Sequence, residues 1–234
     1  MKSSQFVPHG PYMDIINTIG KWKVVDFNSL SELCSFKIEY SNLRKKVKKL
    51  EELGLLKSEN LGRKKKHIFL TNHGIKFTTF DKTYEISDES LNHDIIVGTV
   101  LRSFLQFERF TNGRMFHEII ENEIEPDALL TGIKGGREYE LAIEVELTQK
   151  ASNRVKTKYS RYSRSKTFDY CVFVTHKKGL FWSYARFLGE MNSDVQSKII
   201  IMHALELTPD KFSYIESYCY FKGQEKSFKE IFGE

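Results

Sequence analysis

The segment at residues 141–150 most constrains the fold, because its side chains alternate between apolar and acidic. Side chains of a strand point to opposite faces in turn, so an aliphatic set shares one face and an acidic set shares the other. The aliphatic set is Leu141, Ile143, Val145 and Leu147, and the acidic set is Glu140, Glu144 and Glu146. We expect a strand with one face on a hydrophobic core and the other toward water or a metal ion.

A further carboxylate precedes this strand. Asp127 follows Pro126 at the start of a predicted strand at residues 127–133, and the glycine-containing turn at 134–137 suits a hairpin. Adjacent strands would bring Asp127 beside Glu144. Magnesium takes hard oxygen ligands, often one or two carboxylates with waters and substrate phosphate. We therefore predict Asp127 and Glu144 as ligands of Mg²⁺ or Mn²⁺, if the chain is catalytic.

Two residues complete the predicted catalytic set of Asp127, Glu144, Glu146 and Lys150. A lysine beside the acids would orient an attacking water or neutralise charge that develops on a phosphate. A half-exposed strand with an acidic outer face also explains the alternation. The Pro-Asp pair, the lysine and the basic segment that follows favour the metal site.

That basic segment is predicted to be a helix with tyrosines between its cations. The cations are Arg154, Lys156, Lys158, Arg161, Arg164 and Lys166, and the tyrosines are Tyr159 and Tyr162. Cations beside an acidic cluster suit a polyanion held against a bound metal, so Arg154 and Lys158 are predicted to contact DNA. The alternative is a solvated helix face, the usual role of a charge run.

The first third of the chain predicts a winged helix-turn-helix. Short helical and extended patterns lie between residues 12 and 34, and a third helix follows whose apolar residues share one face. These are Leu43, Val47, Leu50 and Leu53. Two short strands at residues 55–60 and 67–71, joined by a basic turn, complete the pattern.

The cations of this region predict a double-stranded DNA partner. Residues 1–90 hold 16 Lys and Arg against 11 Asp and Glu, a difference of +5 that equals the net charge of the whole chain. A winged helix used for protein contact is the alternative. The predicted DNA-binding residues of the third helix and the wing are Tyr40, Ser41, Asn42, Arg44, Lys45, Lys48, Arg63, Lys64, Lys65 and Lys66.

The carboxy-terminal part predicts a mixed sheet. Residues 81–91 turn acidic and lose helical periodicity, which places a boundary there. The expected order is a helix at 93–110, three strands, the basic helix, a strand, a helix and a strand, which implies helices on both faces of the sheet. The first strand is expected at 114–120. The aromatic segment at 212–232 suits a final hairpin or a dimer surface, and the pattern does not decide between them.

These residues resemble a known superfamily. The Pro-Asp, the Glu-x-Glu strand, the lysine and the tyrosine-bearing basic helix are similar to the PD-(D/E)XK restriction-endonuclease-like proteins. Residues 91–95 and 144–150 resemble the replication-relaxation proteins of plasmids and mobile elements, which carry a winged-helix DNA-binding domain ahead of a nuclease-like domain. The likeness spans most of residues 12–205. Glu146 departs from the pattern by occupying the usual lysine position, and Lys150 would replace that lysine from the next helix.

The resemblance implies an α/β (α+β) fold, with a winged helix-turn-helix domain at residues 1–85 and a restriction-endonuclease-like mixed-sheet domain at 91–234. It also implies a metal-dependent DNA endonuclease or, alternatively, a catalytically inactive DNA-binding regulator of plasmid replication, mobilisation or transcription. Fold alone does not decide between them. A third possibility is an adaptor whose acidic face recruits replication or mobilisation proteins.

Other features narrow the setting of the protein. No apolar run reaches signal-peptide or membrane-spanning length, so we expect a cytoplasmic protein with no membrane partner. The three cysteines and seven histidines lack zinc-ligand spacing. A homodimer would match the two-fold symmetry of duplex DNA. Asp94 is either a further carboxylate of the acidic cluster or an acid at a helix start.

Overall fold

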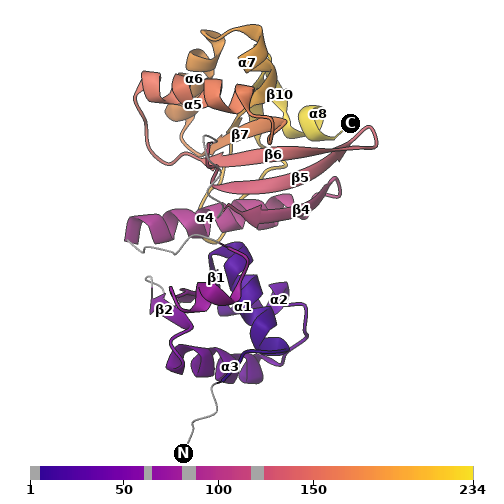
Figure 1. Ribbon diagram of the computed structural model, residues 1–234. Coiled ribbons are helices and arrows are strands. Elements are labelled where there is room, and N and C mark those ends of the chain that lie inside the picture. Colours follow the sequence, from indigo (N-terminus) through magenta and orange to yellow (C-terminus); the bar gives the residue numbers. More distant parts are fainter. Residues whose placement is uncertain (1–5, 61–64, 81–87, 117–123, 234) are drawn as a thin grey trace, which may run out of the picture. The chain divides into compact units, whose positions relative to one another are not determined.

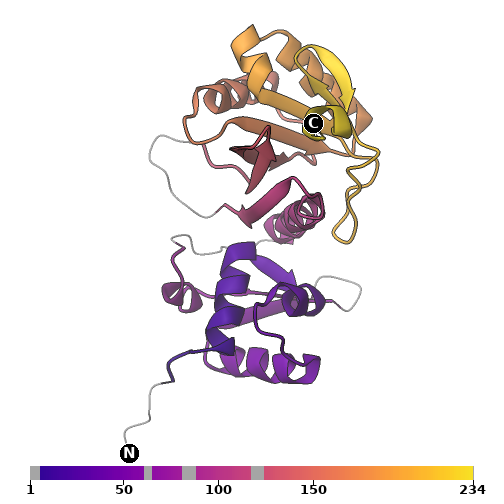
Figure 2. The same ribbon diagram turned by 90° about the vertical axis from the view of Figure 1, so that its right-hand side faces the viewer.

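The computed structural model describes residues 6–60, 65–80, 88–116 and 124–233. The described chain forms two compact units that meet in sequence between Leu91 and Asn92. Figures 1 and 2 show the helices and strands of each unit from two directions. The domain limits of 1–85 and 91–234 remain a prediction.

The first unit has helices around a small antiparallel sheet. Its elements are α1 Pro11–Trp22, β1 Val24–Asp26, α2 Phe27–Leu33, α3 Tyr40–Glu52, β2 Leu56–Asn60, β3 Lys66–Leu70 and the 3-10 turn η1 Gly74–Phe77. The sheet order is β1-β3-β2, with both pairings antiparallel. The order of helices and strands in the described residues follows the predicted one, and the assignment of this unit as a winged helix-turn-helix remains a prediction.

The core of the first unit follows from the apolar faces of its helices. Ile15, Ile16 and Ile19 of α1 are fully buried, and so are three residues of the predicted stripe on α3. The chain leaves α3 through Gly54, whose φ of 69° lies in the left-handed region that favours glycine. The N-cap of α2 is Asp26, whose carboxylate accepts the backbone N–H of Ser29 at 2.8 Å.

The second unit is built on a seven-stranded mixed sheet. Its elements are α4 Asp88–Phe104, β4 Phe110–Met115, β5 Ala128–Lys134, β6 Arg137–Val145, α5 Ser152–Arg164, β7 Tyr170–Thr175, α6 Lys178–Gly189, α7 Ser193–Lys198, β8 Ile199–His203, β9 Tyr218–Phe221, β10 Gln224–Ser227 and α8 Phe228–Phe232. The strand order is β10-β9-β8-β7-β6-β5-β4, with β6, β7 and β8 parallel and the other pairings antiparallel. The predicted mixed-sheet α/β fold is confirmed.

Helices cover both faces of this sheet, as predicted. On one face α5, α6 and α7 pack with residues such as Ala142, Phe173 and Ile201 in one buried cluster. On the other face α4 lies so close to β4 that a side chain at Gly113 would meet Leu101. The alternation along each strand therefore places two hydrophobic layers around the sheet.

Two predicted elements near the start of this unit are wrong in their bounds. The opening helix was predicted at 93–110, but α4 ends at Phe104 and the chain turns before β4. The next strand was predicted at 114–120, whereas β4 is Phe110–Met115 and residues 117–120 lie outside the described residues. Gly113 resembles a loop residue in sequence, but the close approach of α4 requires a residue without a side chain there.

The aromatic end of the chain completes the sheet, as one of the two alternatives from the sequence predicted, and a dimer surface there remains a prediction. Strands β9 and β10 form a hairpin, and β9 pairs with β8. The helix α8 then packs Phe228 against Phe104 of α4 with ring centroids 6.0 Å apart. Within the described residues, no helix has the length and apolar character needed to cross a membrane.

Candidate active site

A hairpin between β5 and β6 brings the predicted acids together. The strands pair antiparallel from Ala128 opposite Ile143 to Lys134 opposite Arg137, and Gly135 and Gly136 form the turn with positive φ. Asp127 stands at the open end of this hairpin. Its carboxylate Oδ2 accepts the backbone N–H of Val145 at 2.7 Å. Asp127 is thereby fixed beside the end of β6 that carries the two glutamates.

Glu144 of β6 and Glu146, directly after its end, lie on the face that was predicted to point toward water or a metal ion, and this face is not exposed to water. Only 1% of Glu144 and 2% of Glu146 is exposed. The face is covered by α5, which packs over this side of the sheet. Glu140, the third glutamate of the predicted set, lies outside this cluster and accepts a hydrogen bond from Thr131 at 3.0 Å.

Two lysines and a tyrosine compensate the buried glutamates. The Lys158 ammonium donates to Glu144 Oε2 and lies 3.7 Å from Glu146 Oε1. The Tyr162 hydroxyl donates to Glu144 Oε1. Lys150 pairs with Glu146 Oε2 at 2.7 Å. Lys158, which the sequence suggested as a DNA contact, is thus turned into the acidic cluster. Lys150 lies beside the cluster as expected, but it precedes α5 and is not part of that helix as predicted.

The amphipathic pattern of α5 explains why Lys158 reaches the acids. Val155, Tyr159 and Tyr162 are the buried residues of this helix. The Tyr159 ring meets Phe173 of β7 edge to face, with centroids 5.0 Å apart. These aromatic contacts pack α5 against the sheet over β6. Lys158 lies at the edge of the packed face of the helix, where its side chain can reach the glutamates.

His93 on α4 is a member of the site that the sequence did not reveal. Its Nε2 lies 3.1 Å from the carbonyl oxygen of Val145 and 3.5 Å from Asp127 Oδ2. Its Nδ1 lies 3.5 Å from Asp94 Oδ1. Asp94 therefore reaches the cluster through His93. The segment at residues 91–95 supported the family resemblance, but nothing in it distinguished His93 from an ordinary helix residue.

The environment sets the charges of these groups. Burial lowers the pKa of His93, but hydrogen bonds to Asp127 and Asp94 outweigh it and raise the pKa to about 10. Burial opposes the charge of Asp127 as well, yet His93 and Lys158 hold its pKa below the usual value. Burial and the charge of Asp127 raise the pKa of Glu144 to about 7, against the opposing effect of Lys158.

The donor set fits a hard divalent cation that keeps most of its waters. The charge of Asp127 acts on Glu144 and raises its pKa, and a bound cation would relieve that repulsion. Among the described residues, no group of three or more His, Cys, Asp and Glu side chains could hold a metal ion. Two carboxylates suffice for Mg²⁺ or Mn²⁺, which take further oxygens from water and phosphate, whereas a structural zinc site needs four protein ligands.

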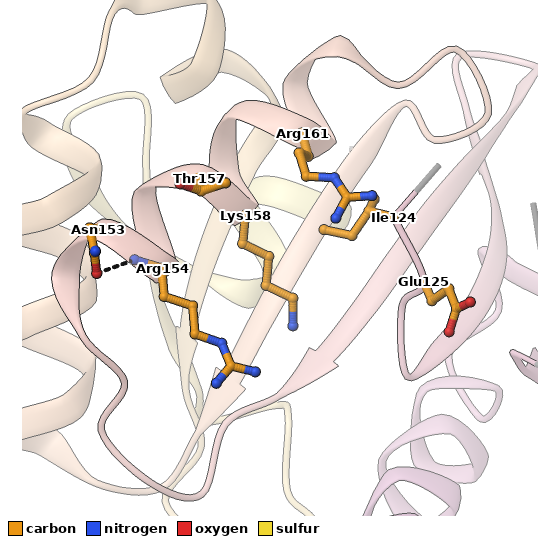
Figure 3. Close-up of a pocket in the computed structure, with 7 residues that line it drawn as sticks. All are labelled: Ile124, Glu125, Asn153, Arg154, Thr157, Lys158 and Arg161. Carbon is orange, nitrogen blue, oxygen red and sulfur yellow. Dashed lines mark hydrogen bonds between the residues drawn. The ribbon is translucent and has the colours of Figure 1, made fainter. Parts of the chain in front are cut away.

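A groove adjoins the acidic cluster along α5 (Figure 3). Its volume is about 530 Å³, and the described residues that line it are Ile124, Glu125, Asn153, Arg154, Thr157, Lys158 and Arg161. Figure 3 shows the side chains of Arg154 and Lys158 extending from α5 across the groove, with Ile124 and Glu125 on the opposite wall. Lys158 therefore belongs to both the groove and the cluster.

The predicted DNA-binding residues of α3 lie together on one exposed face. They are Tyr40, Ser41, Asn42, Arg44, Lys45 and Lys48, and each is exposed. The opposite face of α3 carries its buried residues Leu43, Val47 and Leu50. The amphipathic pattern thus leaves a continuous basic and polar surface on this helix.

The predicted wing is only partly described. Arg63 and Lys64 lie outside the described residues, and Lys65 is exposed. The Lys66 ammonium donates to both carboxylate oxygens of Glu51, at 2.8 and 3.1 Å. Lys66 therefore ties β3 to the end of α3, a contact that its position in a basic run did not indicate.

Comparisons with known proteins give little for this chain. No protein-family model matches it, and no curated protein does. Two similar solved structures are those of the restriction endonuclease FokI, with and without DNA, each 12% identical in sequence. The matches cover 76% of this chain but only 40% and 39% of the FokI chains, with TM-scores of 0.26 and 0.29. At these TM-scores the likeness carries no weight for the function.

Proposed function

We propose that this chain is a double-stranded DNA-binding protein of a plasmid or other mobile element, and that its mixed-sheet unit hydrolyses phosphodiester bonds with Mg²⁺ or Mn²⁺. The observation that carries the proposal is that Glu144 and Glu146 both contact the ammonium of Lys158, with the charge of Asp127 acting on the same ammonium. The ammonium contacts both glutamates, and its pKa is raised by Glu144 and Asp127 in spite of burial. Two carboxylates, Asp127 and Glu144, beside a lysine suit a divalent cation that takes its remaining oxygens from water and a phosphate.

Each residue of the cluster has a role that follows from its contacts. Asp127 and Glu144 would hold the metal, which supplies an activated water and stabilises charge on the phosphate. Lys158 stands where it can bind an oxygen of the scissile phosphate. Lys150, paired with Glu146, would help orient the attacking water. His93 holds Asp127 in its charged form through the 3.5 Å contact.

The exposed face of α3 supports the DNA-binding half of the proposal. In a winged helix, the third helix enters the major groove and the wing contacts phosphates alongside. Arg44, Lys45 and Lys48 lie on the solvent side of α3, so these cations can reach phosphates or base edges without moving the core. Their number suits binding that weakens steeply with salt.

A second function has an observation of its own. Both carboxylate oxygens of Glu144 are engaged, one by Lys158 and the other by Tyr162, and Glu146 is paired with Lys150. Carboxylates whose charge is already compensated by neighbouring side chains can stabilise the fold without binding a metal. In that case the chain is a catalytically inactive DNA-binding regulator of plasmid replication, mobilisation or transcription.

Nicking of supercoiled plasmid separates the two functions. The wild-type protein is incubated with Mg²⁺ or Mn²⁺ and compared with Asp127→Asn and Glu144→Gln, and Glu225→Gln is the matched control because it removes an exposed carboxylate of β10. Nicking by wild type and the control that both site variants lose supports the nuclease. Absence of metal-dependent nicking by a folded wild type that binds duplex DNA supports the regulator.

A further inference from the structure

The groove beside the acidic cluster has a regular row of cations along one wall. Arg154, Lys158 and Arg161 are spaced four and three residues apart, which places them on one face of α5. All three line the groove. Arg154 and Arg161 are exposed, while Lys158 at the centre has a side chain only 23% exposed and reaches the buried Glu144. The two ends of the row are thus exposed to solvent, and its middle residue contacts a buried acid.

The length of the row matches a short stretch of nucleic acid backbone. Seven residues of α-helix span about 10.5 Å, and a strand of DNA carries one phosphate per about 3.4 Å of axis. The row therefore extends over about three phosphate-to-phosphate steps, and Lys158 lies between its two ends. The single acid among the described lining residues, Glu125, stands on the opposite wall (Figure 3).

We propose that this groove holds the sugar-phosphate backbone of one DNA strand, with Arg154 and Arg161 binding the phosphates on either side of the one at Lys158. The inference rests on the proposed function, because it makes the two arginines the positioning residues that bring a phosphate to the carboxylates. It adds that the groove takes a single strand whatever its base sequence. Guanidinium groups suit this role because they bind phosphate oxygens through paired N–H donors.

The test is binding of a labelled single-stranded oligonucleotide of mixed sequence by the full chain, measured by fluorescence anisotropy with chelator and a series of NaCl concentrations. The double variant Arg154→Ala/Arg161→Ala is compared with Arg164→Ala/Lys166→Ala. The control pair removes the same charge from exposed positions that are not among the described lining residues. Thermal melting checks that both variants are folded, since all four side chains are exposed.

The groove variant is expected to bind more weakly and to lower the slope of log K against log salt by about 1.4, because each single-strand phosphate contact contributes about 0.7. The control variant should keep a slope close to that of wild type. Equal slopes for the two variants, or a groove variant that binds like wild type, overturn the proposal.

Parallel plasmid nicking with Mn²⁺ keeps the two proposals apart. A reduced slope in the groove variant together with no nicking by wild type supports the strand groove and contradicts the nuclease. Nicking by wild type together with an unchanged slope supports the nuclease and overturns the groove.

Discussion

Helices α3 and α5 look alike in sequence and differ in what lies beneath them. Each carries cations on one side and buried residues on the other. Beneath α3 the neighbours are apolar, so Arg44, Lys45 and Lys48 stay in solvent. Beneath α5 lies the acidic face of β6, and Lys158 turns inward to Glu144. The surface against which a helix packs, rather than the charge of the helix itself, therefore determines where its cations lie. They either stay in solvent, where they can bind phosphate, or pair with buried acids.

This difference implies different energetics for similar residues. An exposed lysine contributes little to stability, whereas a lysine that compensates buried carboxylates is costly to remove because the acids are left without a partner. It also implies different contributions to function. Cations of α3 should affect DNA affinity alone, and Lys158 should affect both folding and any chemistry at the acids.

The largest expected effect is on phosphodiester hydrolysis. Glu144→Gln should lower the rate of Mn²⁺-dependent nicking by about 10²–10³-fold or more, since it removes a charged group from the reacting centre. Duplex binding measured by anisotropy in chelator should stay within about twofold of wild type, because α3 is untouched. Equal nicking by this variant and wild type would remove Glu144 from the site.

The next effect is the pH dependence of stability. The pKa of Glu144 is raised from 4.5 to about 7 in the folded chain, so the folded state binds a proton that the unfolded state releases. Wild type should therefore lose stability relative to Glu144→Gln as pH rises from about 4.5 to about 7, by about 3 kcal/mol. Urea unfolding in chelator across this range measures the difference. If the difference in free energy of unfolding between the two proteins does not change with pH, the raised pKa of Glu144 is contradicted.

Removal of the central cation comes third. Lys158→Met should lower the free energy of unfolding by about 2 kcal/mol, less than the 3–5 kcal/mol typical of a fully buried pair because the lysine is partly exposed. Lys48→Met on α3 is the matched control, with an expected change within about 0.5 kcal/mol. Chemical denaturation of both variants at neutral pH makes the comparison. Similar losses of unfolding free energy for the two variants would contradict the difference between the cations of α3 and α5.

The smallest effect concerns single cations of the first unit. Arg44→Ala should lower the salt slope of duplex binding by about 0.9, the contribution of one phosphate contact. Lys66→Ala should change the slope less, because its ammonium is held by Glu51 at 2.8 Å. Titrations of one duplex with each variant at several salt concentrations rank the two changes in slope. A larger change for Lys66 would show that the wing dominates over α3.

Strong periodic patterns predicted much of the fold. The stripe on α3, the alternation on β6 and the glycine turn between β5 and β6 all specify local structure, and the structure contains each of them. The bounds of α4 and β4 were not predictable in the same way. Gly113 acts through its contact with Leu101 on α4, and such a distant contact leaves no periodic trace in the sequence.

The positions of the acids and of Lys150 were predictable from the sequence, whereas those of Lys158 and His93 were not. Asp127 and Glu144 follow from strand pairing, because a hairpin brings neighbouring strands together. Lys158 could not be singled out among the cations of α5, since only packing of Tyr159 against Phe173 decides which lysine reaches Glu144. His93 approaches from a helix more than 30 residues earlier in the chain than Asp127, and its role depends entirely on tertiary structure.

Anomalous diffraction from crystals grown with Mn²⁺ tests the acidic cluster most directly. We expect one manganese ion bound by both Asp127 and Glu144, with metal–oxygen distances of about 2.1 Å, and no ion at these residues in Glu144→Gln crystals. If saturating Mn²⁺ leaves these two carboxylates without an ion while Lys158 keeps its contact with Glu144, the cluster is a structural ion-pair network and the chain is not a metal-dependent nuclease.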